Sequence, residues 1–205
     1  MRKKRKHRGP GTGTGVCAVP IKGCKPRGIP RRELRTLPEL VNRFHSEFDT
    51  GADFRFFRKL KPWHAVIEQA GMAMNEHGKR FPHQYRLKKV ALKAATRRLH
   101  RADLKSCKDF DSLFGEVENA VASIKGIGPL YVYDTACRIG ESLRLRPKRV
   151  YLHAGTRSGA RAIGLGRGCA VVEMDELPKA MRSLTPSQVE DFLCICKDDL
   201  WRVFS

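Results

Sequence analysis

Hydrophobic residues recur at helical spacing along most of the chain that follows residue 30. A helix that packs on one face needs an apolar residue every three or four positions, and several segments meet this requirement. The predicted helices span about residues 34–48, 63–74, 83–100, 109–125, 129–143, 154–163 and 185–200. Val90 is expected to face inward, the run from Thr185 to Gln188 has a capping pattern, and residues 150–152 are expected to form a short extended link. Neither an alternating series typical of strands nor a repeat of fixed period is visible. The pattern therefore predicts an all-α fold in the form of a single helical bundle.

Two of these helices meet across a turn that contains two glycines. The strongest apolar stripe runs from Phe110 to Ile124, and Asp109 precedes it as a cap. The next helix begins near Pro129, whose fixed φ angle and missing N–H suit a first helical turn. The residues that connect the two helices are Lys125, Gly126, Ile127 and Gly128. This order predicts a helix-hairpin-helix over about residues 109–144.

Such a hairpin is suited to contact a phosphate group. Gly126 and Gly128 lack the Cβ atoms that would block a close approach, and the second helix begins with unpaired backbone N–H groups at its positive end. A phosphate oxygen can bind there. Ile127 would brace the hairpin between the helices, and Lys125 would add a cation at the rim. The alternative is an ordinary turn between helices that happens to need two glycines.

The charge of the chain favours a polyanionic partner. The sequence holds 41 Lys and Arg against 21 Asp and Glu, a formal net charge of +20. Residues 1–32 hold eleven Lys or Arg and no acid, so the rest of the chain is basic as well. Neutralising phosphates releases condensed counterions, which makes nucleic acid the leading partner. An anionic membrane surface and an acidic protein are the competing interpretations.

The first 30 residues differ in composition from the rest. They are basic, rich in Gly and Pro and poor in large apolar residues, so they cannot bury enough surface to offset the entropy of ordering. We expect residues 1–30 to be a disordered basic arm that adds non-specific binding, and residues 31–205 to form one all-helical DNA-binding domain. The start resembles neither a secretory signal nor a membrane span, so no membrane partner is predicted.

The seven cysteines indicate reduced thiols. They are odd in number and irregularly spaced, and no C-x2-C pair occurs among them. We therefore predict no metal site, no iron–sulfur cluster and no other cofactor, although His77 and His83 could join a site that folding assembles. The expected location is intracellular, either cytoplasmic or nucleoid-associated, and nuclear if the source is eukaryotic.

A second basic stretch lies further along the chain. In the segment from Gly155 to Arg161, Thr156 and the N-terminal amides of a short helix lie near Arg157 and Arg161, which share one helix face. This combination suits phosphate contact. The alternative is a helix whose glycines ease its packing against a neighbour. The basic face predicted for residues 83–100 is expected to be an electrostatic track rather than a reader of base sequence.

Together these segments resemble the helix-hairpin-helix superfamily, and within it the endonuclease III-like branch of DNA glycosylases. Ile124 to Pro129 is similar to that branch's hairpin. The run from Val150 to Gly155 is similar to its Val-Asp-Thr-His segment, and the run from Ala162 to Leu165 to its Leu-Gly-Leu helix end. The resemblance covers roughly residues 110–165. It implies binding to duplex DNA and removal of a modified or flipped base by hydrolysis of the N-glycosidic bond.

The same resemblance identifies the positions where chemistry is expected. His153 stands where the branch keeps its catalytic Asp, and Leu130 stands where bifunctional members keep a Lys. Asp134, one turn into the second hairpin helix, is a replacement carboxylate, so Asp134 and His153 are the catalytic candidates. The alternative is a solvated Asp134, a capping His153 and a non-enzymatic architectural or recruiting module. Tyr131 or Tyr133 could stack on a displaced base, or both could simply be buried.

Overall fold

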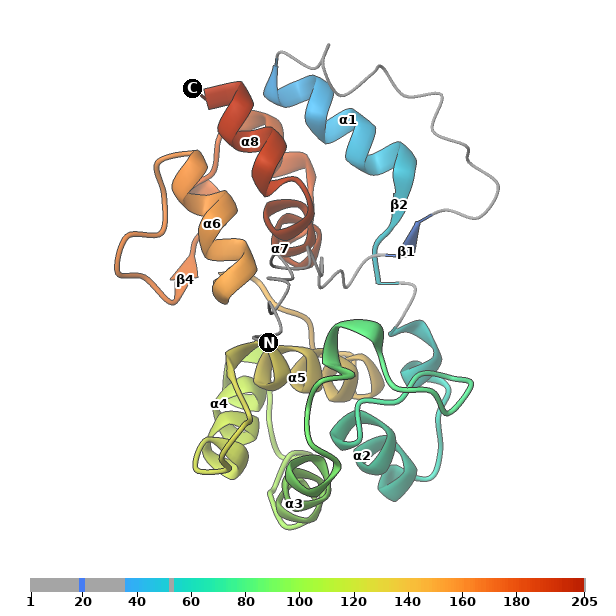
Figure 1. Ribbon diagram of the computed structural model, residues 1–205. Helices are drawn as coiled ribbons and strands as arrows, with labels where there is room; N and C mark the ends of the chain where they lie inside the picture. The colour runs from blue at the N-terminus through green and yellow to red at the C-terminus, as the bar shows by residue number, and fades with distance from the viewer. Residues whose placement is uncertain (1–18, 21–35, 52–53, 205) are drawn as a thin grey trace, which may run out of the picture.

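The computed structural model describes residues 19–20, 36–51 and 54–204, and within them the fold is mostly helical (Figure 1). The helices are α1 Leu37–Glu47, α2 Trp63–Gly71, α3 Lys89–Leu99, α4 Phe110–Val121, α5 Pro129–Leu143, α6 Ala154–Ala162, α7 Pro186–Ile195 and α8 Lys197–Phe204. Four two-residue strands accompany them: β1 Val19–Pro20, β2 Phe48–Asp49, β3 Val150–Tyr151 and β4 Val171–Val172. The all-α expectation is confirmed at this coarse level.

The apolar residues form two core clusters. One belongs mainly to an inner lobe made of α2 to α5, residues 54–149, and it includes Ile67, Leu92, Leu113 and Ile139. The other belongs to a terminal lobe, in which α1 from one end of the chain packs with α6, α7 and α8 from the other (Figure 1). A single bundle would have one continuous core. The expected bundle is instead divided, and the division creates a boundary between the lobes.

Helix α5 lies at this boundary. All ten residues from Tyr131 to Gly140 are buried, so this helix has no solvated face along that length. It packs against α4, against α2 and against the turn at Arg55–Arg58. Near its C-terminal end, the following residues pack closely on the helix, because a Cβ atom at Gly140 would lie 2.6 Å from the carbonyl oxygen of Leu145. Polar side chains on α5 are therefore held inside the protein.

Several helix ends differ from the sequence prediction. The helix expected to span residues 83–100 begins only at Lys89, because Pro82–Gln84 forms a separate 3-10 turn and Lys88 is extended. Val90, which was expected to face inward, is 72% exposed. The helix expected to reach residue 125 ends at Val121. The last predicted helix is broken after Ile195 into α7 and α8.

The helix caps that were predicted are present. Asp109 caps α4 with its side chain, as expected, whereas α1, expected from about residue 34, begins at Leu37 after a cap at Thr36 that was not predicted. The predicted capping pattern at the start of α7 is also present, since the Thr185 hydroxyl accepts the N–H of Gln188. Side-chain oxygens at these positions satisfy backbone N–H groups that lack a partner inside the helix.

The strands form two short antiparallel pairs. In one, Val19 lies opposite Asp49 and Pro20 opposite Phe48. In the other, Val150 pairs with Val172 and Tyr151 with Val171. The extended link predicted at residues 150–152 is therefore present. Apart from Val19 and Pro20, the predicted arm lies outside the described residues.

Candidate nucleic-acid interface and interlobe pocket

The turn between α4 and α5 is compact. The N–H of Ile124 donates to the carbonyl of Val121 at 2.9 Å, and the N–H of Ile127 donates to the carbonyl of Ile124 at 3.0 Å. Lys125 and Gly126 are exposed, whereas Ile127 is half-buried and packs against the inner-lobe core. The turn therefore keeps its apolar residue inward and its cation and first glycine outward.

The fold requires a glycine at only one of the two glycine positions in the turn. Gly126 has a φ angle of +94°, a region that residues with a Cβ rarely adopt. Gly128 caps α5 with a φ of −125°, which any residue can adopt. A Cβ at either position would meet no atom of the described part of the chain within 4 Å. Folding therefore explains the glycine at 126 but gives no reason for the one at 128.

Arg98 of α3 holds the other side of the hairpin. Its guanidinium donates to the Ser123 hydroxyl at 2.5 Å and to the carbonyl of Ala120 at 3.4 Å. The C-terminal end of α3 therefore lies beside the turn. Sequence reasoning placed Arg98 in no role, because the contact joins positions more than twenty residues apart.

The second predicted phosphate stretch is only partly available. Thr156 is fully buried, and its hydroxyl accepts from the N–H of His153 at 2.7 Å and donates to the carbonyl of the same residue at 2.9 Å. Arg157 and Arg161 are exposed on α6. A Cβ at Gly159 would collide with the backbone of Leu193, so this glycine does ease helix packing. The two arginines remain candidates for phosphate contact.

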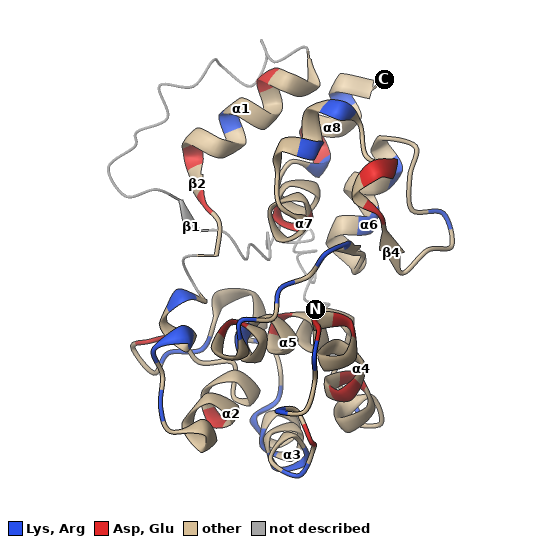
Figure 2. Cartoon of the chain, turned by 180° about the vertical axis from the view of Figure 1, so that it is seen from behind, with Lys and Arg blue, Asp and Glu red and all other residues tan. Residues whose placement is uncertain are grey.

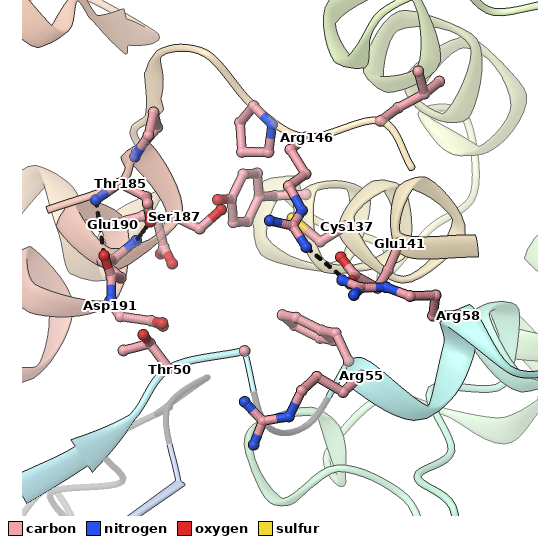
Figure 3. Close-up of a pocket in the computed structure, with 17 residues that line it drawn as sticks. Thr50, Arg55, Arg58, Cys137, Glu141, Arg146, Thr185, Ser187, Glu190 and Asp191 are labelled. Carbon is pink, nitrogen blue, oxygen red and sulfur yellow. Dashed lines mark hydrogen bonds and ion pairs between the residues drawn. The ribbon is translucent and has the colours of Figure 1, made fainter. Parts of the chain in front are cut away.

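A pocket of about 460 Å³ lies between the lobes (Figure 3). The inner lobe contributes Phe54, Tyr133 and Cys137, and the terminal lobe contributes Glu190 and Asp191 together with the first turn of α7. Figure 3 shows the two carboxylates on one side and a group of arginines on the other. Those arginines are Arg55, Arg58 and Arg146. The pocket thus has an acidic wall and a basic wall.

Ion pairs hold the basic wall in place. Glu141 pairs with Arg58 and, at 3.4 Å, with Arg146. Arg55 makes a two-pronged contact with Asp49 at 2.5 and 3.0 Å. Such exposed pairs add little to stability, but they orient the guanidinium groups. Sequence reasoning did not find this wall, because its residues come from three separate segments.

On the acidic wall, Glu190 is linked to His153. The His153 imidazole Nε2 contacts a carboxylate oxygen of Glu190, and the two residues are 5% and 2% exposed. Burial tends to lower the pKa of His153, but the hydrogen bond and the charge of Glu190 outweigh it and raise that pKa. Burial also raises the pKa of Glu190. Both shifts favour a proton that stays on the pair beside the pocket.

Asp134 is buried, which rules out the alternative of a solvated helix residue. It is 0% exposed and accepts hydrogen bonds from Gln84 at 2.5 Å and from His83 at 2.8 Å. A guanidinium nitrogen of Arg138 lies 3.6 Å away. Burial acts to raise the pKa of Asp134, but His83 and Arg138 outweigh it and lower that pKa. Asp134 is not among the residues that line the pocket.

The two tyrosines of α5 are both buried, which was the alternative to stacking on a displaced base. Tyr131 is 2% exposed and donates to the carbonyl of Gly71 at 2.7 Å. Tyr133 is 3% exposed and reaches the pocket wall. Only Tyr133 is therefore placed to contact a molecule in the pocket.

Neither a protein-family model, nor a curated protein, nor a solved structure matches this chain. No helix in the part of the chain that the structure describes is both long enough and apolar enough to cross a membrane. Among those same residues, no three His, Cys, Asp or Glu side chains are grouped to hold a metal ion. Cys17 and Cys24 lie outside the described residues. Any function must therefore be argued from the hairpin, the charge and the pocket.

Proposed function

We propose that the protein binds duplex DNA through the hairpin between α4 and α5. The observation that carries this proposal is the open space at Gly128. The position caps the N-terminus of α5, where backbone N–H groups and the helix dipole favour an anion. Among the described residues, no contact requires a residue without a Cβ there. A phosphate oxygen that approaches the backbone would require one.

The surrounding charges support the same partner. Lys125 is exposed within the turn, and Arg98 holds the adjoining end of α3. The net charge of +20 supplies the long-range attraction that brings a polyanion to this surface. Backbone amides and cations that contact phosphates position a duplex without reading its sequence.

The salt dependence of binding tests this proposal. Lys125→Gln is expected to reduce the slope of log affinity against log salt by about 0.9 on duplex DNA, because one phosphate contact is lost. The measurement is fluorescence anisotropy with a labelled duplex over a series of salt concentrations. Lys179→Gln is the control, because Lys179 is exposed in the terminal lobe and its loss is expected to leave the slope unchanged. A wild-type protein that fails to bind duplex DNA contradicts the proposal.

A second candidate function is hydrolysis of the N-glycosidic bond of a base turned out of the duplex into the pocket. The observation that favours it is the pair of neighbouring carboxylates on α7 that line the pocket opposite three arginines. Cleavage of a glycosidic bond commonly uses two carboxyl groups, one to donate a proton and one to support the cationic sugar or the attacking water.

The proposed reaction assigns different roles to the two carboxylates. In the proposed reaction, water forms a bond to C1′ of the sugar as the bond from C1′ to the base breaks. The Glu190–His153 pair donates a proton to the departing base, and Asp191 stabilises the sugar cation and accepts the proton of the water. His153 then acts through Glu190 as a positioning residue, and Asp134 acts by fixing α5. The reaction is tested by measuring base release from a panel of duplexes with modified bases. If no base is released from any of them, a non-enzymatic DNA-binding module is favoured.

A further inference from the structure

The segment from Lys79 to Arg101 carries an unusual excess of positive charge. It holds nine Lys or Arg and no Asp or Glu. Other arginines of the protein, such as Arg43, Arg58 and Arg138, form ion pairs with carboxylates. Within the described residues, none of the nine cations in this segment forms such a pair. Their charge is therefore not neutralised within the described protein.

Three of these cations form a row on α3. Lys89, Lys93 and Arg97 are four residues apart and exposed, so they follow one face of the helix about 6 Å apart along its axis. The opposite face is buried through Leu92 and Leu99. Figure 2 shows the basic positions along α3 at the end of the inner lobe that lies away from the terminal lobe. A regular row of cations on a rigid helix suits a chain of regularly spaced anions.

An exposed aromatic ring stands at the N-terminal end of this row. Tyr85 is 61% exposed, and the Arg86 guanidinium lies 5.5 Å from its ring centroid. Arg80 donates to the carbonyls of Tyr85 and Leu87 at 3.1 and 2.9 Å, which fixes the backbone that carries the ring. Tyr85 is not part of the inner-lobe core, so its ring is available to a partner. Its exposure among cations suggests a partner with flat, π-bonded groups as well as negative charge.

The row is continuous with the proposed hairpin contact. Its C-terminal end is the part of α3 from which Arg98 reaches Ser123, beside the turn. A nucleic-acid strand that leaves the hairpin can therefore follow α3 toward Tyr85. A duplex keeps its base faces stacked inside, whereas a single strand exposes them to aromatic side chains.

We propose that Tyr85 and the row of Lys89, Lys93 and Arg97 bind single-stranded nucleic acid, with phosphates along the row and a base stacked on the tyrosine ring. This inference deepens the proposed function by naming the form of nucleic acid that the inner lobe takes in addition to duplex. The proposed hairpin contact enters this inference only as the point from which the strand reaches α3. It would give the protein a preference for duplexes that carry a single-stranded segment.

The test compares two ligands, a labelled oligothymidylate and a blunt duplex, by fluorescence anisotropy. Tyr85→Ala is expected to weaken oligothymidylate binding about tenfold, because one base loses its stacking on the ring, and to leave duplex binding unchanged. Tyr85→Phe keeps the ring and is expected to restore wild-type affinity. Replacement of all three row residues by Gln is expected to lower the salt slope on the single strand by about 2. Phe204→Ala, at an exposed aromatic residue of α8, is the matched control and is expected to change neither affinity.

Three outcomes overturn the inference. The first is unchanged oligothymidylate affinity in Tyr85→Ala. The second is equal loss of duplex and single-strand affinity in that variant, which would make the surface a general electrostatic track. The third is displacement of the oligonucleotide by polyglutamate at equal charge concentration, which would indicate an acidic protein partner. If the wild type binds only the single strand and does so through Tyr85, the inference holds while the proposed duplex contact fails.

Discussion

Replacement of Asp134 by Asn is expected to lower the free energy of unfolding by about 3 kcal/mol or more, because removing one partner of a buried ion pair leaves the other charge uncompensated. Arg138 is fully buried, and Asp134 is the carboxylate beside it. His83 loses the same partner. Urea unfolding measures the change, and with a slope of about 2 kcal/mol per molar the midpoint should fall by about 1.5 M.

Two further measurements show whether the charge of Asp134 is the cause. Asp103→Asn removes an exposed carboxylate that takes part in no described ion pair, and it should change stability by no more than about 0.5 kcal/mol. Because the folded-state pKa of Asp134 is lowered, its contribution is complete above its ordinary pKa of 3.8 and is lost as the pH falls through the folded-state value. Acidification should therefore destabilise the wild type more than Asp134→Asn. If the free energy of unfolding of Asp134→Asn lies within about 1 kcal/mol of the wild-type value, the effect is no larger than that of an ordinary substitution, and the buried-pair account is refuted.

Replacement of Asp191 by Asn is expected to reduce base release about a hundredfold or more, if the pocket cleaves N-glycosidic bonds, because the negative charge that stabilises the sugar cation is lost. The Asn side chain keeps the shape of the wall. Affinity for DNA should hold or rise slightly, because one negative charge near the phosphates is gone. Single-turnover release of a modified base measures the effect, and abasic sites are quantified by alkaline cleavage.

Asp198→Asn serves as the control for this substitution. Asp198 is an exposed carboxylate of α8 that does not line the pocket, so base release should remain close to that of wild type. Full activity in Asp191→Asn would exclude Asp191 as the stabilising carboxylate. If Asp134→Asn loses activity while Asp191→Asn keeps it, and both variants are equally folded, Asp134 is the catalytic carboxylate, as the sequence predicts.

The sequence predicted the helices well where apolar stripes are regular. The stripe from Phe110 to Val121 and the helix that begins at Pro129 follow directly from spacing and cap residues. Val90 was misplaced because its apolar character suggests burial, although it lies on the same exposed face of α3 as Lys93 and Arg97. Ends of helices depend on contacts with other elements, which a single segment does not reveal.

The buried charges could not be read from the sequence. Asp134 resembles a solvated helix residue because one carboxylate on α5 gives no sign that the helix is covered on all sides. Its partner His83 lies fifty-one residues away, and Glu190 lies thirty-seven residues from His153. The pocket combines residues from 50–58, 133–147 and 185–191, so only folding brings its two walls together. The glycine turn, in contrast, was visible because all of its residues are adjacent.

The effect of a methyl group at Gly128 tests the central claim most directly. Gly128→Ala is expected to weaken duplex binding about tenfold or more, because a hydrogen bond from a backbone amide to a charged phosphate contributes about 1.5–3 kcal/mol. Its free energy of unfolding should stay within about 0.5 kcal/mol of wild type, because the added Cβ meets no atom of residues 36–51 or 54–204 within 4 Å. Gly115→Ala in α4, where a Cβ also meets nothing within 4 Å, is the matched control and should leave binding unchanged. Equal duplex affinity for Gly128→Ala and wild type, measured by anisotropy on the same duplex, would contradict the claim that the hairpin holds DNA.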